Sequence, residues 1–261
     1  MKCKKIFTSI VMLGSLSTNL LATNIEDNNI SLTETQVGEM ATSYFKSHPA
    51  KMLEIMQSVK LALKEQKYNG VKKTLISHKA MLLNNIFLPV IGNPKESKTL
   101  LFFYDFQCVY CHKEYPFIKQ LVQQDKDVKV VFLPLHIFGK ASEYATKMAL
   151  YMSSKNKFQA FYDAVEEGDL IEGKLNNVAV DKIVTNLDIN LKDAKEYVES
   201  QVADKRIEEI DALKDSLGIQ GTPFMFAMPS EAGHLSLKNI EVIRGYVSID
   251  VLKNSLNKVK N

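Results

Sequence analysis

The sequence is poor in cysteine and contains no tryptophan: three cysteines and no Trp occur in 261 residues. Cys3 lies at the very start, so only Cys108 and Cys111 remain in the rest of the chain. One Cys-x-x-Cys pair supplies two of the four ligands that a structural zinc site needs, and no second pair has the right spacing. Repeats and low-complexity segments are also missing, so the chain is no repeat array.

The first 22 residues have the pattern of a secretory signal peptide. Lys2, Lys4 and Lys5 precede an uncharged, apolar run over residues 6–22, which is too short and too rich in serine and threonine for a comfortable membrane span. We expect cleavage near Ala22 and export to the periplasm. An uncleaved N-terminal anchor is the alternative.

The charge balance gives no support for a nucleic-acid or membrane partner. The whole chain has 33 Lys and Arg against 30 Asp and Glu, and the expected signal peptide holds three of the lysines and no acid. The mature protein is therefore close to neutral, because the three lysines of the signal peptide account for the positive net charge of the precursor.

Cys108 and Cys111 are candidates for redox chemistry. Export places them in an oxidising compartment, where disulfides persist. A disulfide between them would close a loop of only a few residues, so a purely stabilising disulfide is a poor explanation for the pair. Three histidines could complete a metal site with the two cysteines: His112, His136 and His234. No second pair of ligands among them has the right spacing, so we expect no metal.

Haem attachment is a further interpretation, because Cys108-Val-Tyr-Cys111-His112 matches the pattern C-x-x-C-H. The flanking residues disfavour it, and we expect no cofactor. Residues 99–106 form an apolar, aromatic-rich run that predicts a buried strand. Apolar residues after the motif recur at helical spacing, and His112 is then expected on the solvent-facing side of this helix.

A cysteine placed where a strand turns into a helix is chemically activated. The first N–H groups of a helix have no internal partner and carry the positive end of the macrodipole, so they stabilise a thiolate. Lowering a cysteine pKa by about three corresponds to about 4 kcal/mol in favour of the thiolate. We therefore expect Cys108 to be the nucleophile and Cys111, almost one turn further in, to resolve the mixed disulfide.

Four segments together resemble the DsbA-like branch of the thioredoxin superfamily. The first is Asp-Phe-Gln-Cys-Val-Tyr-Cys at residues 105–111, and the others are residues 88–94, 130–143 and 217–223. The resemblance covers the chain from about residue 88 to its end. It implies an α/β thioredoxin-like fold with a helical insertion, and a protein disulfide oxidoreductase or isomerase with a Cys108–Cys111 redox disulfide. In the family, the loop that corresponds to Thr222-Pro223 has a cis-proline and contacts the substrate.

Two positions depart from the thioredoxin pattern. Phe102 stands where thioredoxin-type proteins often bury an acid, and Gln107 stands where thioredoxins have tryptophan before the motif. The group that accepts the proton of Cys111 is therefore open. Asp105, Glu114 and an ordered water are the candidates.

An all-helical region over residues 23–86 precedes the catalytic domain. We expect a capping box at Ser31-Leu-Thr-Glu34, a stop signal at Asn69-Gly70 and a third helix over residues 71–85. So few amphipathic helices cannot build a good core alone. Related exported oxidoreductases dimerise through such an extension, so we expect a homodimer through residues 24–85. Docking on the same chain is the alternative.

The catalytic domain is expected over residues 87–261. Strands are expected at 99–105, 128–134, 223–228 and 240–244, with a hairpin turn at 231–234 and a closing helix at 251–259. A helical insertion at about 140–217 separates the second and third strands. Its last three helices are expected at 178–187, 191–203 and 204–217.

Three functions are compatible with this pattern. The first is a disulfide donor that oxidises exported cysteine-containing proteins and is recycled by a membrane partner of the DsbB kind. The second is an isomerase or reductase that is kept reduced by a partner of the DsbD kind, and one protein could do both. The third is a redox-inert binding protein that retains the fold. Two intact cysteines with the proline loop disfavour the third.

Overall fold

The computed structural model describes residues 32–84, 87–93, 97–230 and 235–259. The signal segment, the turn at 231–234 and the ends of two other predicted segments, Asn85 and Pro94, lie outside these residues. The chain divides into two compact units, one that ends at Gln57 and one that begins at Ser58. The domain boundary that we expect at residue 86 is a different division, and it stays a prediction.

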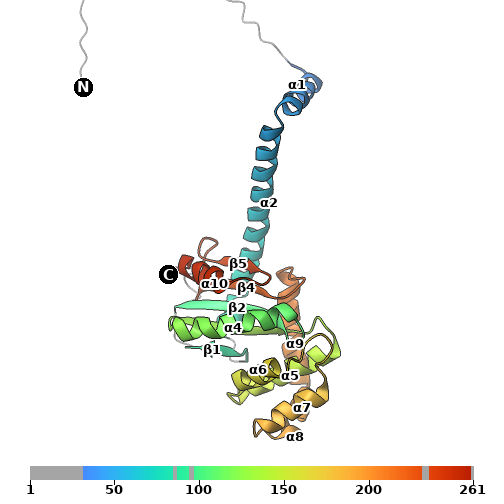
Figure 1. Cartoon of the computed structure of the whole chain (residues 1–261), viewed down its shortest axis with the longest axis vertical. Coiled ribbons are helices and arrows are strands. Elements are labelled where there is room, and N and C mark those ends of the chain that lie inside the picture. The colour runs from blue at the N-terminus through green and yellow to red at the C-terminus, as the bar shows by residue number, and fades with distance from the viewer. Residues whose placement is uncertain (1–31, 85–86, 94–96, 231–234, 260–261) are drawn as a thin grey trace, which may run out of the picture. The chain divides into compact units, whose positions relative to one another are not determined.

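A five-stranded mixed sheet forms the centre of the second unit (Figure 1). The strand order is β1-β3-β2-β4-β5, with β2 and β3 parallel and every other pair antiparallel. The strands are β1 (Val90–Gly92), β2 (Lys98–Asp105), β3 (Val128–Leu135), β4 (Phe224–Pro229) and β5 (Glu241–Arg244). The four strands that the sequence predicts are confirmed.

The short strand β1 was not predicted. It has three residues and pairs with β3, with Val90 opposite Val131. Gly92 ends it with a φ of 98°, and a Cβ atom there would lie 2.5 Å from the carbonyl oxygen of Val128. Only glycine fits this close approach.

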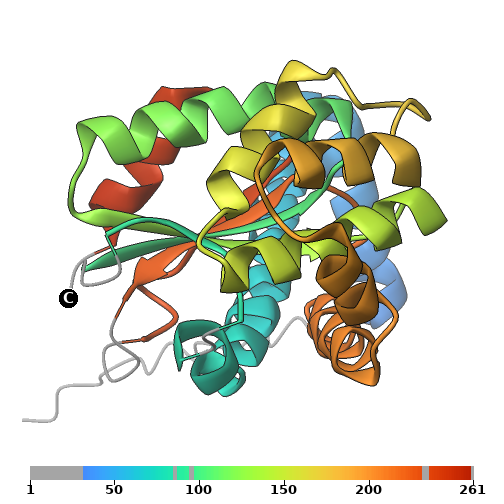
Figure 2. The same ribbon diagram turned by 90° about the horizontal axis from the view of Figure 1, so that it is seen from below.

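Helices cover both faces of the sheet, because alternate residues of a strand point to opposite sides. Phe102 and Tyr104 of β2 belong to one apolar cluster with α4 (Val109–Gln124) and α10 (Ile249–Lys258). Leu101 and Phe103 belong to the other, with α3 (Lys79–Asn84) and α9 (Gln201–Ser216). Figure 2 shows the sheet between these two layers.

The insertion between β3 and β4 is helical, as predicted. It comprises α5 (Lys140–Ser154), α6 (Phe158–Glu167), α7 (Asn177–Asn186), α8 (Leu191–Val198) and α9. The predicted boundary between the last two helices was wrong. The Ser200 side chain accepts a hydrogen bond from the backbone N–H of Ala203, so this N-cap starts α9 at Gln201 rather than at residue 204.

The expected capping box at Ser31 was misplaced. Helix α1 (Glu34–Ser47) begins after Thr33, whose side chain and backbone exchange hydrogen bonds with Gln36 in a capping box. The sequence holds two overlapping patterns of this kind, and the second one caps the helix. Ser31 itself lies outside the described residues.

The expected helix stop at Asn69-Gly70 was also wrong. Helix α2 (Pro49–Ser77) continues through both residues, and α3 follows at Lys79 rather than at residue 71. A glycine inside a helix costs only about 1 kcal/mol. Continuing the helix instead brings Leu75, which is fully buried, into the apolar cluster that also contains Leu82. No helix in the described part of the chain is both long and apolar enough to cross a membrane.

Candidate functional site

Cys108 lies at the junction between β2 and α4, as the sequence predicts. It is the N-cap residue of α4, and its carbonyl oxygen accepts hydrogen bonds from the backbone N–H groups of Cys111 and His112. Its own N–H donates to the carbonyl oxygen of Asp105, at 3.0 Å, which closes the turn out of β2. Cys108 is 5% exposed and Cys111 fully buried, and both are free thiols.

The pKa values of the two thiols are shifted in opposite directions. The pKa of Cys108 is lowered to about 6. The largest cause is a hydrogen bond from the Cys111 thiol; burial opposes it, and the Thr222 side chain and the N–H groups of Tyr110 and Cys111 assist. The pKa of Cys111 is raised well above its usual value by burial and then by the neighbouring Cys108. At neutral pH the arrangement therefore holds a thiolate at Cys108 and a protonated thiol at Cys111.

The proline loop lies against the first cysteine. The Thr222-Pro223 peptide bond is cis, as predicted, and β4 begins directly after it at Phe224. In the dithiol form, the Cys108 thiol donates a hydrogen bond to the carbonyl oxygen of Thr222, with a sulfur–oxygen distance of 3.4 Å. The fold thus brings together four of the residues that the sequence singles out: Cys108, Cys111, Thr222 and Pro223.

A pocket of about 520 Å³ opens beside Cys108. Tyr110 and Phe138 contribute aromatic side chains that are 57% and 55% exposed. The remaining lining residues are Gln107, Val109, Lys113, Glu172, Gly173 and Thr222. A mostly apolar hollow with a nucleophile at its wall can hold a polypeptide side chain next to a disulfide under attack.

The two acids near the motif differ in their surroundings. Both are fully buried. The carboxylate of Asp105 accepts hydrogen bonds from the Gln107 N–H, the Phe138 N–H and the Ser142 hydroxyl, at 2.8, 3.1 and 2.7 Å. Burial raises its pKa, and these bonds oppose the rise. Asp105 therefore anchors the turn after β2.

The carboxyl group of Glu114 accepts fewer hydrogen bonds than that of Asp105. Its Oε2 accepts a hydrogen bond of 2.9 Å from the backbone N–H of Val247. Its Oε1 is buried without a hydrogen-bond partner among the described residues. Burial raises the pKa of Glu114 to about 7, so it exchanges a proton readily near neutral pH.

His112 does not face solvent, contrary to the expectation from the sequence. Its side chain is 10% exposed. The ring atom Nε2 lies 2.7 Å from the carbonyl oxygen of Phe106, and Nδ1 lies 3.2 Å from a carboxylate oxygen of Glu166. Burial lowers the pKa of His112, but these acceptors outweigh it and the net shift is upward. With both nitrogens engaged, the ring is not free to ligate a haem iron.

The other candidate metal ligands do not gather. His136 pairs with Asp211 at 2.8 Å, and His234 lies outside the described residues. Within the described ranges, no group of three or more His, Cys, Asp or Glu side chains is placed to hold a metal ion.

Sequence reasoning missed the role of polar residues that support the motif from the insertion. Ser142 and Glu166 contact Asp105 and His112, but they lie 37 and 54 positions away from them and carry no motif of their own. The periodicity of α5 and α6 predicts only which residues are apolar. The contacts need the tertiary fold.

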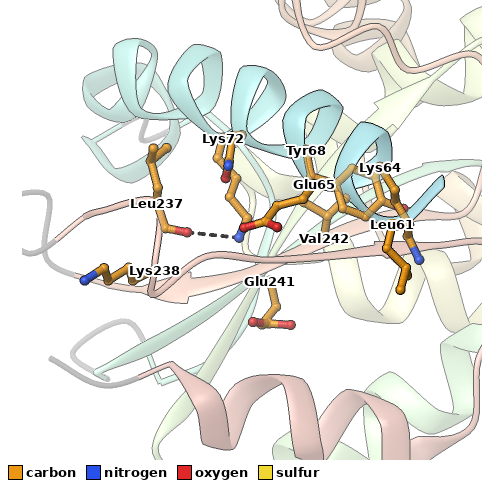
Figure 3. Close-up of a pocket in the computed structure, with 10 residues that line it drawn as sticks. Leu61, Lys64, Glu65, Tyr68, Lys72, Leu237, Lys238, Glu241 and Val242 are labelled. Atoms are coloured by element: carbon orange, nitrogen blue, oxygen red, sulfur yellow. Dashed lines mark hydrogen bonds between the residues drawn. The ribbon is translucent and has the colours of Figure 1, made fainter. Parts of the chain in front are cut away.

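A second, larger hollow of about 780 Å³ shares no lining residue with the pocket at Cys108 (Figure 3). It is lined by residues 61–72 of α2, by the start of β5 and by the segment that leads into this strand. Lys72 crosses it and donates a hydrogen bond of 2.9 Å to the carbonyl oxygen of Leu237. It contains no cysteine or histidine, so the redox chemistry belongs to the smaller pocket.

Comparison with known families agrees with this geometry. The family model of the DSBA-like thioredoxin domain matches residues 99–257, which are more than half of the chain and include both cysteines and the proline loop. The chain belongs to the DSBA-like thioredoxin domain family. It is a DsbA-like thiol–disulfide oxidoreductase with a Cys-x-x-Cys pair, and its fold is the thioredoxin-like fold with a helical insertion.

Solved structures of DsbA-like and thioredoxin-like proteins share this fold. BcfH of Salmonella enterica Typhimurium is 21% identical, with 87% of this chain and 96% of that one covered and a TM-score of 0.75. The thiol-disulfide exchange protein alpha-DsbA2 of Wolbachia pipientis is 24% identical, with 75% and 98% covered and a TM-score of 0.62. A periplasmic thioredoxin-like protein of Salmonella enterica serovar Typhimurium is 24% identical, with 71% and 96% covered and a TM-score of 0.56. No curated protein matches the chain.

Proposed function

We propose that this DsbA-like protein exchanges disulfides with exported proteins through Cys108 and Cys111, forming or isomerising their disulfide bonds. The observation that carries the proposal is the position of Cys108 at the N-terminus of α4, beside the cis Thr222-Pro223 loop, and the opposite pKa shifts of the two thiols agree with it. A stabilised thiolate at Cys108 makes that sulfur both a ready nucleophile and a good leaving group, and it makes the Cys108–Cys111 disulfide an oxidant.

The oxidation of a substrate proceeds in two exchanges. A substrate thiolate attacks Cys108 in the disulfide, a substrate–Cys108 bond forms, and Cys111 leaves as a thiolate that takes up a proton. A second substrate thiolate then attacks the substrate sulfur of this mixed disulfide, and Cys108 leaves as a thiolate. Two electrons pass from the substrate to the Cys108–Cys111 pair. Thr222 and Pro223 form the loop that meets the substrate beside Cys108.

Glu114 is our proposed proton carrier for Cys111. It lies one turn further along α4, and it has a buried carboxyl oxygen without a partner in the described structure. Its raised pKa, about 7, suits a group that gives and takes a proton at neutral pH. Asp105 is less suited, because three hydrogen bonds hold its carboxylate.

The direction of electron flow decides between a disulfide donor and an isomerase. The experiment is acid quench of growing cells, followed by alkylation with a mass-shifting reagent and a gel. A mostly oxidised Cys108–Cys111 pair identifies a donor recycled by a partner of the DsbB kind. A mostly reduced pair identifies an isomerase or reductase supplied with electrons by a partner of the DsbD kind. Cysteines that resist alkylation even after reduction would contradict the whole proposal and favour haem thioethers.

We further propose that the protein acts in the periplasm as a homodimer. The signal-like segment over residues 1–22 supports export, and a similar structure is described as periplasmic. Helix α1 has no buried side chain within one copy, and several of its apolar residues are exposed: Val37, Met40 and Tyr44. Isolated short helices are marginal in water, so a second copy that packs on this face would stabilise it.

A further inference from the structure

The side chain of Gln107 joins the cysteine motif to two segments of the helical insertion. It is 6% exposed. Its amide Nε2 donates to the hydroxyl oxygen of Ser142, at 2.9 Å, and lies 3.4 Å from the carbonyl oxygen of Phe138. Its Oε1 accepts a hydrogen bond of 3.0 Å from the backbone N–H of Gly173. The glutamine amide supplies both the donor and the acceptor that these contacts use.

The segments that Gln107 holds are one wall of the pocket beside Cys108. Phe138, Glu172 and Gly173 all line that pocket. Glu172 and Gly173 lie in the irregular loop between α6 and α7, where both have positive φ, 46° and 86°. Two hydrogen bonds join this pair of residues to the motif. The Gly173 N–H donates to the Gln107 side chain, and the Glu172 N–H donates to the backbone carbonyl oxygen of Gln107, at 3.5 Å.

A second set of bonds fixes Gln107 itself. Its backbone N–H donates to Asp105 Oδ1, and the same oxygen accepts the Ser142 hydroxyl. Asp105 and Ser142 are fully buried, so the three residues form a closed polar network inside the protein. Buried networks whose members are all bonded are rigid. The Gln107 side chain is therefore held rigidly, and it supports the wall together with the Asp105 carboxylate, which also accepts a hydrogen bond from the Phe138 N–H.

We propose that Gln107 is a positioning residue for polypeptide substrates: it holds Phe138 and the Glu172–Gly173 turn in place, so that a polypeptide disulfide is presented to Cys108. This inference rests on the thiol–disulfide exchange proposed above. We expect a smaller disulfide such as oxidised glutathione, which presents no extended polypeptide, to depend on Cys108 and little on this wall. Loss of the Gln107 bonds should then weaken the reaction with peptides selectively.

The test compares Gln107→Met with Gln124→Met, the same substitution at an exposed position at the end of α4. Each reduced protein reacts with a disulfide-bonded peptide that carries a quenched fluorophore and, separately, with oxidised glutathione. We expect the second-order rate constant for the peptide to fall about tenfold in Gln107→Met, because the peptide concentration that half-saturates the single-turnover rate rises while the limiting rate stays similar. The glutathione rate should stay within about twofold, and Gln124→Met should match the wild type.

Other outcomes overturn the inference. Equal losses with both substrates would mean that Gln107 acts on Cys108 rather than on the wall, and no loss with either would mean that the wall needs no support. A wild type that reacts with neither disulfide would instead refute the proposed function. Should Gln107→Met fail to fold, Ser142→Ala removes one of the bonds and leaves the glutamine in place. Its peptide rate must then fall, by less than tenfold, with an unchanged glutathione rate.

Discussion

The thiol of Cys108 donates a 3.4 Å hydrogen bond to the carbonyl oxygen of Thr222, a residue 114 positions further along the chain. Cys108 follows β2 and Thr222 precedes β4, and these two strands are neighbours in the sheet, paired antiparallel. The pairing of β2 with β4 therefore places the proline loop next to Cys108.

Replacing Cys111 by alanine should raise the pKa of Cys108. The hydrogen bond from the Cys111 thiol is the largest cause of the lowered value of about 6, so its loss returns Cys108 toward an ordinary thiol. The measurement is the rate of alkylation by iodoacetamide as a function of pH, in the wild type and in Cys111→Ala. A wild-type midpoint near pH 9 would contradict the thiolate on which the mechanism depends.

Replacing Thr222 by valine should make the disulfide a weaker oxidant without unfolding the protein. Valine has a similar shape but cannot donate to the Cys108 thiolate, so the pKa of Cys108 rises and the reduced form loses stability. Loss of one hydrogen bond corresponds to about fivefold in the equilibrium with glutathione, toward the oxidised protein. Thr185→Val, at an exposed site on α7, is the control. Equal equilibria for wild type and Thr222→Val would refute the role of the hydroxyl.

Glu114 should make the protein less stable as pH rises. Its pKa is about 7 in the folded state against an ordinary 4.5, so the folded state binds more protons between these values. Stability then falls across this window and levels off above it. Glu114→Gln removes this pH dependence. The difference in the free energy of unfolding between Glu114→Gln and the wild type should therefore grow in favour of the variant by up to about 3 kcal/mol across the window.

Chemical denaturation of both forms at several pH values measures this gain, and the exposed Glu209→Gln serves as control. A constant difference between Glu114→Gln and the wild type would show that the carboxyl does not titrate in this range. The same variant tests the proton carrier, because resolution of the mixed disulfide by Cys111 should slow at neutral pH. An unchanged resolution rate would assign that proton to another group.

Glu166 should raise the pKa of the His112 ring. Burial lowers the pKa of His112, and the Glu166 carboxylate and the Phe106 carbonyl more than offset this. The stabilisation is fully present below the ordinary histidine pKa of 6.5 and is lost as pH rises through the raised value. Glu166→Gln should lower the pKa of His112 in an NMR titration, whereas the exposed neighbour Glu167→Gln should not. Identical titrations in all three proteins would refute the pairing.

Placing a charge on the exposed face of α1 should disrupt self-association. Met40 is 60% exposed in one copy, and a glutamate there would be buried unpaired between two copies. We expect light scattering after gel filtration to give a dimer for the wild type and a monomer for Met40→Glu. Val178→Glu, an exposed site on α7, should remain dimeric. A monomeric wild type, or a dimer that survives Met40→Glu, would exclude this interface.

Much of the fold follows from local pattern. The apolar run of β2 and the helical spacing after Cys111 place the cysteines correctly, because burial on both faces of a central strand leaves a continuous hydrophobic sequence. The errors occur where a local signal is weak. Gly70 costs too little to stop α2 against the burial of Leu75, and β1 is too short to show a pattern.

The sequence by itself determined the chemistry: one Cys-x-x-Cys pair after a buried strand, and a distant Thr-Pro before another strand. These are properties of short segments, and their physical reasons are local. Only the tertiary structure decided which groups surround the thiols. Burial raises the pKa of Glu114, the insertion brings Ser142 and Gly173 to Gln107, and Glu166 reaches His112. Such contacts depend on how elements that are distant in the sequence pack, and hydrophobic periodicity does not predict which polar side chains contact one another.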